Sequence, residues 1–284
     1  MKDEEILIIG SNGQLGRALQ QKYPAATAVD SDKLDITNKE ALENYDWSKT
    51  KVIINAAAYT NVDGAEIDTG RILAWDINAV APSYLVNVCL QNEIVLVHIS
   101  TDYVFDGTKD MHTETEKLSP ISVYGESKAA GDIAVSILPS HYILRTSWVI
   151  GDGKNFVKTM LELGNKGINP QVVSDQIGRL TFTNELVKAI SHLLSNQSPF
   201  GTYNVSNEGA VVSWADITRE IFKLAGFTNT VTNVTTVDYY KGKKNIAPRP
   251  LQSSLDLSKL KETGYSPNNW NDDLSKYIKE QGSL

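Results

Sequence analysis

The chain has 284 residues, 41% of them hydrophobic and 21% charged, a composition that fits a globular protein with a nucleotide-binding domain and a smaller second lobe. Its net charge of −7 argues against broad binding of nucleic acid, because neutralising a phosphate backbone requires a basic surface. The single cysteine, Cys89, cannot form an intrachain disulfide, which fits a reducing compartment.

The N-terminal segment lacks the long apolar stretch and the small-residue cleavage site of a signal peptide. No uninterrupted apolar run approaches the length of a membrane-spanning helix. We therefore expect a cytoplasmic protein that has no membrane and no nucleic acid among its partners.

The first half of the chain alternates short apolar runs with amphipathic stretches, a pattern typical of parallel strands covered by helices. The apolar runs predict strands at 6–9, 26–30, 51–55, 94–100 and 142–145. The amphipathic stretches predict helices at 14–22, 38–45, 76–91 and 124–137. The second helix is expected to open with a capping box of Thr37 and Glu40. The predicted fold class is α/β, with a Rossmann-type doubly wound parallel sheet in residues 1–150.

A glycine-rich segment joins the first predicted strand to the first predicted helix. Gly10, Gly13 and Gly16 have the spacing G-x-x-G-x-x-G, which differs from the G-x-G-x-x-G of ordinary dinucleotide folds. In this context glycines allow a tight turn, a close approach of the backbone to a pyrophosphate, and close contact between helix and strand. The N–H groups at the helix N-terminus then face the phosphates. We predict a dinucleotide site here rather than a simple turn.

Two charged residues give opposite indications about the cofactor. Asp30 ends the second predicted strand, where a carboxylate commonly accepts hydrogen bonds from ribose hydroxyls and favours NAD. Arg17 follows the last glycine and could pair with a 2′-phosphate, which favours NADP. Either residue could also be a solvated surface charge. The preference between the two cofactors therefore stays open at this point.

Tyr124 and Lys128 lie four residues apart on a predicted helix and hence on one face of it. A nearby ammonium would lower the tyrosine pKa from about 10 toward the range of a general acid or base. This pattern is common by chance, and its weight comes from following the glycine loop and a strand that ends in Ser100 and Thr101. One of these two hydroxyls could polarise a carbonyl at the sheet edge, because neighbouring side chains point to opposite faces. Alternatively, they cap the strand or the following turn.

The second half of the chain is divided into shorter segments by Gly, Asn and Pro. Helical periodicity returns at 184–194 and 213–224, where Trp214, Ile217 and Ile221 predict a core stripe. The Thr/Val-rich run 231–237 predicts a strand, and residues 255–284 predict two short helices. We assign 151–177 and 205–284 mainly to a smaller C-terminal substrate-binding lobe, and we expect 178–204 to return to the first domain.

Taken together, these motifs make the sequence resemble the dTDP-4-dehydrorhamnose reductases of the extended short-chain dehydrogenase/reductase superfamily. The resemblance spans nearly the whole chain and is carried by the glycine loop and by segments 55–63, 100–105, 124–128, 145–148, 155–160 and 175–178. It implies reduction of the C4 keto group of dTDP-4-dehydro-L-rhamnose to dTDP-L-rhamnose, a step in polysaccharide biosynthesis. Such enzymes commonly use NADPH or NADH, and we expect NADPH here with NADH as a second cofactor.

The resemblance also implies roles for single residues. Thr101 would polarise the carbonyl, Tyr124 would donate the proton, and Lys128 would support Tyr124 and hold the ribose. With Tyr124 and Lys128, the residues expected to line the cofactor are Gly10, Asn12, Gly13, Gln14, Leu15, Gly16, Arg17, Asp30, Asp35, Ile36, Ala57, Ala58 and Tyr59. The residues expected to contact the substrate are Thr101, Asp102, Tyr103, Trp148 and Arg249. Arg249 would bind the diphosphate or, alternatively, serve as a turn residue between two prolines.

One position departs from the family pattern. Some of these reductases form a magnesium-dependent dimer through glutamates, one of them on the first helix, where this chain has Ala18. Loss of a carboxylate removes both charge and a ligand from a site for a hard cation. We therefore expect no metal at that interface, and a monomer or a weak homodimer.

Other functions are compatible with the same fold. Sugar-nucleotide 4,6-dehydratases and 4-epimerases are the nearest enzymatic alternatives. The dehydratases share Thr101 and Asp102 but continue with a glutamate needed for elimination, where this chain has Tyr103. The regulatory subunit of methionine adenosyltransferase is a non-catalytic relative that keeps the cofactor loop but lacks the stretch ending at Trp148. The presence of Trp148 favours the enzyme.

Overall fold

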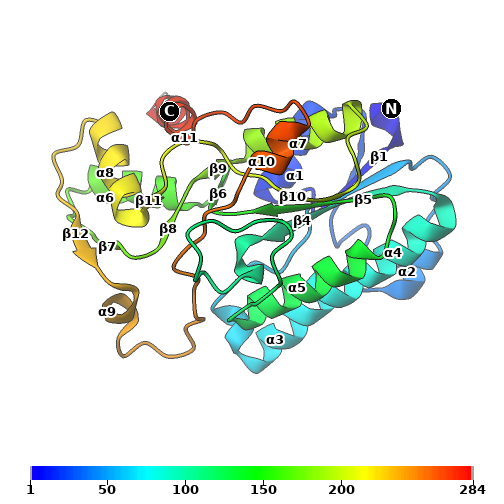
Figure 1. The fold of residues 1–284 in the computed structure, drawn as a ribbon, viewed down its shortest axis with the longest axis horizontal. Helices are drawn as coiled ribbons and strands as arrows, with labels where there is room; N and C mark the ends of the chain where they lie inside the picture. Colours follow the sequence, from blue (N-terminus) through cyan, green and yellow to red (C-terminus); the bar gives the residue numbers. More distant parts are fainter. Residues whose placement is uncertain (1, 283–284) are drawn as a thin grey trace.

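The computed structural model describes residues 2–282 of the chain. A six-stranded parallel sheet, in the order β10-β5-β4-β3-β1-β2, forms the larger part of the molecule and is seen nearly edge-on in Figure 1. Its strands are β1 (Ile6–Ile9), β2 (Thr27–Val29), β3 (Val52–Asn55), β4 (Val95–Thr101), β5 (His141–Thr146) and β10 (Gly201–Asn204). The predicted Rossmann-type fold is confirmed.

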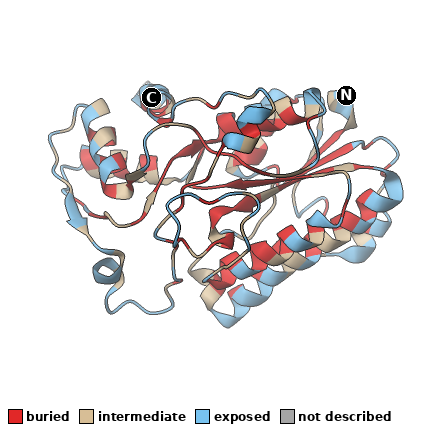
Figure 2. Ribbon diagram, in the orientation of Figure 1, coloured by how far each residue is buried: buried red, intermediate tan, exposed pale blue. Residues whose placement is uncertain are grey.

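Helices cover both faces of this sheet (Figure 1). One face packs against α2 (Lys39–Glu43), α4 (Ala81–Asn92) and α5 (Val123–Ser136), which contribute Leu42, Leu85 and Val135 to a shared core. The other face packs against α1 (Gln14–Lys22), α7 (Thr183–Ser195) and α10 (Ser258–Glu262). Because both faces are covered, β1 and β3 are buried at every position, as the red strands of Figure 2 show.

The sheet order places a ligand crevice. The chain passes from β1 to β2 on one side and then crosses back to β3 on the other side of β1. Ligands of open α/β sheets bind at such a reversal, outside the carboxyl ends of the strands. Gly10 follows β1 and Ala56 follows β3, so the glycine loop lies at the reversal.

The helix predicted at 76–91 begins earlier than expected. α3 (Asp68–Trp75) continues through a π-helical turn (Asp76–Val80) into α4, so that Asp68–Asn92 is one helix of 25 residues. By length and by a mean hydropathy of 1.2 it could cross a membrane, contrary to the expectation from the sequence. Half of the window that meets this criterion is buried inside the protein, and core helices often meet it too. The helix is weak evidence for a membrane span.

The start of α2 corrects a second prediction. Asn38 caps this helix, because its side chain accepts a hydrogen bond from the Ala41 N–H at 3.1 Å. The Thr37 hydroxyl instead donates to Asp35 at 2.7 Å. The capping box predicted from Thr37 and Glu40 is therefore wrong, since an Asx residue one position later already satisfies the helix N-terminus.

The smaller lobe lies at the left of Figure 1, beyond the carboxyl ends of the strands. Its main elements are α6 (Phe156–Asn165), α8 (Trp214–Leu224), α9 (Thr236–Tyr240) and α11 (Trp270–Gly282), with short strands β6 (Val149–Ile150), β7 (Gln171–Val173), β8 (Ile177–Gly178), β9 (Thr181–Phe182), β11 (Val212–Ser213) and β12 (Thr232–Val234). The strand predicted at 231–237 is correct only for its first part. The Thr235 hydroxyl accepts from the Asp238 N–H at 3.1 Å and so starts α9.

Candidate active site

The glycine loop is pressed against the ends of β1 and β3. Gly10 has a left-handed backbone, with φ of +79°, and a Cβ there would lie 2.6 Å from the Ala57 nitrogen. A Cβ on Gly16 would lie 2.1 Å from the Gly10 carbonyl oxygen. Both contacts are with backbone atoms, so only glycine fits at either position. This close packing brings the N-terminus of α1 up to the crevice, where its free N–H groups suit the phosphates of a dinucleotide.

A first cavity of about 440 Å³ opens beside this loop, at the ends of β1, β2 and β3. Seven of the residues predicted to line the cofactor border it, namely Gly10, Gly13, Asp30, Asp35, Ile36, Ala57 and Ala58. The Asp30 carboxylate is fixed in place because it accepts from the Asn12 N–H and from the Ser31 N–H, each at 2.9 Å. The carboxylate at the end of β2 is thus held on the cavity wall, where ribose hydroxyls could donate to it.

Arg17 is directed elsewhere. Its Nε lies 3.2 Å from the Asp152 carboxylate, and its guanidinium also donates to the backbone carbonyls of Asp152 and Asn12. Of the described residues that line the first cavity, none is an arginine or a lysine. The residue expected to favour a 2′-phosphate is therefore paired with an acid outside the cavity, whereas Asp30 lies on its wall.

A second cavity of about 460 Å³ adjoins the first and shares Gly13, Ala56 and Ala58 with it. The predicted residues that line it are Gln14, Leu15, Thr101, Asp102, Tyr103, Tyr124, Lys128 and Trp148. The Tyr124 ring packs edge-to-face on Tyr103, with centroids 5.4 Å apart. The structure thus brings Thr101 from β4 together with Tyr124 and Lys128 from α5, three residues that are buried in one place.

Hydrogen bonds at its N-terminus fix α5 in this position. The Ser122 hydroxyl caps the helix by accepting from the Gly125 N–H at 3.2 Å. The Glu66 carboxylate accepts from the Val123 N–H at 3.0 Å. On the next turn, the Asn78 side chain donates to the Ser127 hydroxyl at 3.0 Å and ties α5 to the π-helical turn. These contacts orient the helix face that carries Tyr124 and Lys128.

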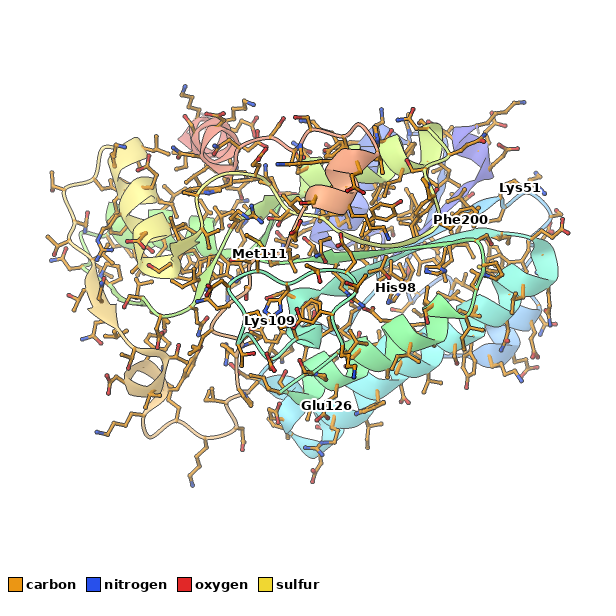
Figure 3. The ribbon with its side chains drawn as sticks, in the orientation of Figure 1. Lys51, His98, Lys109, Met111, Glu126 and Phe200 are labelled. Carbon is orange, nitrogen blue, oxygen red and sulfur yellow. The ribbon has the colours of Figure 1, made fainter. Side chains whose placement is uncertain are left out.

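A neutral histidine lies under α5. His98, labelled in Figure 3, lies on the side of the sheet that faces α5, and its Nδ1 accepts from the Asn55 side chain at 3.2 Å. Burial, followed by the charge of Lys128, holds the pKa of His98 well below its usual range. Since His98 stays uncharged, Lys128 carries the positive charge in this part of the core.

The electrostatics of the pair differ from the expectation. Burial raises the pKa of the Tyr124 hydroxyl, although a hydrogen bond with Thr101 acts in the opposite direction. Burial also lowers the pKa of Lys128 to about 8, opposed by the charge of Asp132, and Lys128 Nζ donates to the Ile99 carbonyl at 2.6 Å. The predicted lowering of the tyrosine pKa is therefore wrong, because burial has the largest effect and the hydrogen bond with Thr101 opposes it only in part. Tyr124 is held as a neutral phenol, which is the form that donates a proton.

A third cavity, of about 290 Å³, lies between the two lobes and is bordered by Tyr103, Trp148 and Arg249. Trp148 has a left-handed backbone, with φ of +47°, and its ring stacks on Trp214 at a centroid distance of 3.8 Å. Arg249 forms two hydrogen bonds with the Asp63 carboxylate, at 2.8 and 2.9 Å. Tyr103 and Trp148 also border the second cavity, so the second and third cavities lie next to each other.

Comparison with known proteins identifies the family of this chain. The family model described as the RmlD substrate binding domain matches residues 4–283. The chain belongs to this RmlD family. It is 38% identical to the dTDP-4-dehydrorhamnose reductase of Aggregatibacter actinomycetemcomitans, over 93% of this chain and 95% of that relative.

Solved structures agree with the RmlD assignment. A dTDP-4-dehydrorhamnose reductase from Clostridium acetobutylicum aligns with a TM-score of 0.91 and 38% identity, over 99% of this chain and 100% of its own. The enzyme of the same name from Bacillus anthracis, solved in complex with NADP, aligns with a TM-score of 0.90 and 36% identity over the same shares of the two chains. The resemblance inferred from the sequence motifs is confirmed.

Some residues predicted to line the cofactor do not border either of the cavities beside the glycine loop. These are Asn12, Gly16, Arg17 and Tyr59. Gly16 packs on the loop itself, and Asn12 acts through its backbone N–H on Asp30. The Tyr59 hydroxyl lies against Gly64 and Gly70, and the Asn78 side chain forms hydrogen bonds with both the N–H and the carbonyl of Tyr59.

The site also contains residues that the sequence did not single out in this RmlD chain. Trp214, interpreted as part of a core stripe, lines the third cavity, whereas Ile217 and Ile221 are in the core as predicted. Thr146 and Ser147 line the second cavity. Their hydroxyls are buried and have no hydrogen-bond partner among residues 2–282. Thr146 ends β5 and Ser147 follows it, so both lie at the carboxyl edge of the sheet, where ligands bind in this fold. This position could have identified them from the sequence.

Ala18, expected to replace a metal-binding glutamate of related dimers, lies on α1. Ala18 is half-buried and borders a groove that includes Phe182 and Tyr277. Within the described part of the chain, no group of three or more His, Cys, Asp or Glu side chains is arranged to hold a metal ion.

Replacing Trp148 by alanine is expected to raise the KM for a nucleotide sugar by roughly tenfold and the KM for NADPH much less, because its indole stacks on Trp214 at the third cavity, which none of the residues predicted to line the cofactor borders. Steady-state kinetics with each substrate varied in turn measures both effects. Trp75→Ala is the matched control, since Trp75 is a half-exposed tryptophan of α3 outside the three cavities. Equal rises in the two KM values would contradict a sugar-side role.

Proposed function

We propose that this protein reduces the C4 keto group of dTDP-4-dehydro-L-rhamnose to dTDP-L-rhamnose with NADPH, as the NADP complex of the Bacillus anthracis relative suggests. We propose that it also accepts NADH, which the position of Asp30 on the wall of the first cavity favours. The observation that carries the proposal is the meeting of Thr101, Tyr124 and Lys128 in one buried cavity next to the glycine loop. The names of the RmlD relatives and the NADP complex of the Bacillus anthracis enzyme support it. We expect the reaction to take place in the cytoplasm as a step of polysaccharide biosynthesis.

The residues of the site suit a reduction. The dinucleotide, bound along the glycine loop, supplies the hydride that the carbonyl carbon receives. The Tyr124 hydroxyl gives its proton to the carbonyl oxygen, and the Thr101 hydroxyl polarises that oxygen by a hydrogen bond. The positive charge of Lys128 stabilises the tyrosinate that remains after the proton has left. Each residue thus has one part in a single transfer of hydride and proton.

The two lobes divide the ligands between them. Residues 1–150, with 178–204, would bind the dinucleotide, while 151–177 and 205–284 would hold the sugar nucleotide. Thr101, Asp102, Tyr103 and Trp148 would contact the sugar ring. Arg249 would bind the diphosphate: its guanidinium lies 4.7 Å from the centre of the Tyr240 ring and is held at the cavity wall by Asp63, with which phosphate oxygens would compete.

Elimination, the reaction of the dehydratases, fits the site less well. Burial raises the pKa of Tyr103, which therefore stays protonated near neutral pH and cannot take the part of the glutamate base of the dehydratases. A binding-only role, as in the regulatory subunit of methionine adenosyltransferase, would not require a buried phenol and a buried ammonium beside an empty space for a carbonyl.

The test follows the absorbance of NADPH when dTDP-4-dehydro-L-rhamnose is added to the purified protein, with NADH and with the UDP analogue in parallel. We expect oxidation of NADPH and a product whose NMR spectrum is that of dTDP-L-rhamnose. Tight binding of NADPH without oxidation would sink the proposal and favour a regulatory subunit. A product that is a C4 epimer of dTDP-L-rhamnose would correct the sugar but keep the reductase chemistry.

A further inference from the structure

Asp102 is a buried acid. In the reaction proposed above, its only role is to contact the substrate. It follows Thr101 at the end of β4, and its side chain is almost fully buried. Its Oδ1 lies 3.0 Å from the Thr101 hydroxyl oxygen. Its Oδ2 is buried and has no hydrogen-bond partner among residues 2–282. An ionised carboxylate in this position would be compensated only in part, because burial opposes its charge more strongly than the neighbouring groups favour it.

The protonation state of Asp102 determines which group accepts the hydroxyl proton of Thr101. A hydroxyl has one proton to donate and two lone pairs that accept. The Thr101 oxygen already accepts from the Tyr103 N–H at 3.2 Å. An ionised Asp102 can only accept, so it takes the proton of Thr101 and leaves none for a substrate carbonyl. A protonated Asp102 donates to Thr101 instead and fills its second lone pair. The proton of Thr101 is then available to the Tyr124 oxygen or, when a substrate is bound, to the keto oxygen of that substrate.

We propose that Asp102 is a positioning residue that acts in its protonated form, donating to Thr101 and so directing the Thr101 proton to the keto oxygen of the substrate. This inference rests on the proposed reductase function. No bond is made or broken at Asp102 or Thr101. The carbonyl carbon receives hydride, the oxygen receives the proton of Tyr124, and Asp102 and Thr101 each keep their own.

The surroundings of Asp102 favour the protonated form. Burial raises the pKa of Asp102 to about 6, while the nearby side chains of Ser253 and Thr101 and the charge of His112 act in the opposite direction. Tyr103 and Tyr124 also face it, and burial raises their pKa values, so both are neutral at moderate pH. A substrate diphosphate brings further negative charge to the site, which raises the pKa of an acid and holds its proton to higher pH.

The expected pH dependence of kcat follows from the requirement that Asp102 be protonated. Because the active form of Asp102 is protonated, its contribution to kcat is complete at low pH and is lost as the pH rises through the pKa of Asp102. Lys128 produces a separate decline, since its charge is lost above a pKa of about 8. The two declines can be separated by replacing Asp102 alone.

The experiment compares kcat from about pH 5 to about pH 9 for the wild type, Asp102→Asn and Asp102→Ala. Asparagine donates an N–H at every pH. We therefore expect D102N to lose the fall in kcat that accompanies ionisation of Asp102 and to keep the fall at higher pH that accompanies deprotonation of Lys128. Alanine donates nothing, so D102A is expected to lower kcat by roughly ten- to a hundredfold at low pH. Glu185→Gln is the matched control, because Glu185 is a fully buried acid of α7 outside the three cavities, whose pKa burial also raises.

A double-mutant cycle separates positioning from direct contact with the substrate. If Asp102 acts through Thr101, D102A costs almost nothing further in a Thr101→Val background. An equal cost in both backgrounds would overturn the proposal, as would a D102N profile that declines with pH in parallel with the wild type.

A measurement without turnover keeps this inference apart from the reductase assignment. In protein labelled with ¹³C at aspartate carboxyls, the Asp102 signal is identified by its loss in D102N and titrated in the NADPH-bound protein. We expect a pKa raised to about 6 or above. A pKa near 4, the ordinary value for aspartate, would overturn the proposal even if no keto sugar is reduced. Failure of turnover with a raised Asp102 pKa would instead overturn the proposed substrate.

Discussion

Replacing Tyr124 by phenylalanine is expected to lower kcat by roughly a thousandfold or more, because a positioned general acid contributes about 10² to 10⁴ in rate and this one also supports the hydrogen bonding of Thr101. The affinity for NADPH should change little. The ring of Tyr124, which packs on Tyr103, is retained in phenylalanine, and the lost hydroxyl acts on the transition state. Turnover measured by NADPH absorbance and binding measured by NADPH fluorescence separate the two quantities.

Tyr103→Phe is the control for removal of a phenol from this cavity. Tyr103 lines the same space and its burial raises its pKa in the same direction, but it has no proton to give in the proposed reaction. We expect its loss to act mainly on the KM of the sugar nucleotide. If Y124F kept the wild-type kcat, or if the two variants lost activity equally, Tyr124 could not be the proton donor.

Replacing Gly16 by alanine is expected to abolish measurable NADPH binding and to destabilise the protein by about 3 kcal/mol. The added Cβ would lie 2.1 Å from the Gly10 carbonyl oxygen and 2.7 Å from the Ser11 Cα. Both are backbone atoms, which cannot rotate away as a side chain can, so the loop must leave the position that faces the phosphates. Fluorescence titration with NADPH and unfolding in denaturant measure the two effects.

Gly282→Ala is the matched control for adding one methyl group. Gly282 ends α11, and among residues 2–282 a Cβ there meets no atom within 4 Å outside its own turn of helix. Because alanine has a higher helix propensity than glycine, this variant should be as stable as the wild type or slightly more so. Wild-type affinity of G16A for NADPH would show that the tight contact of the loop is not needed for binding the dinucleotide.

The sequence predicts the part of this site that depends on local geometry. The requirements for glycine at positions 10 and 16 come from contacts within a few residues or at the end of a neighbouring strand, and spacing reveals them. The direction of Arg17 was out of reach. Its partner, Asp152, lies 135 residues later, and no local pattern relates the two. Only the packing of the second lobe against the glycine loop brings them together.

Electrostatic predictions fail for a related reason. The spacing of Tyr124 and Lys128 correctly predicts a shared helix face, but the pKa of each depends on how much of the protein covers it. That burial comes from elements far apart in the sequence, including Ile99, whose carbonyl receives the Lys128 ammonium. Trp214 shows the same limit, since its periodicity is that of a core residue and the third cavity beside it depends on Trp148 and Arg249.

The position of β10 has a consequence for how this chain is made. β10 pairs with β5 at one edge of the main sheet, and α7 contributes Leu186 and Ile190 to the core above that sheet. Both follow α6 and β7, which belong to the smaller lobe. On the ribosome, the main sheet therefore stays without its last strand, and with an uncovered apolar face, until residue 204 has been synthesised. The nascent chain must protect that edge while the intervening lobe is still emerging, and a gene cut near codon 150 would leave it open permanently.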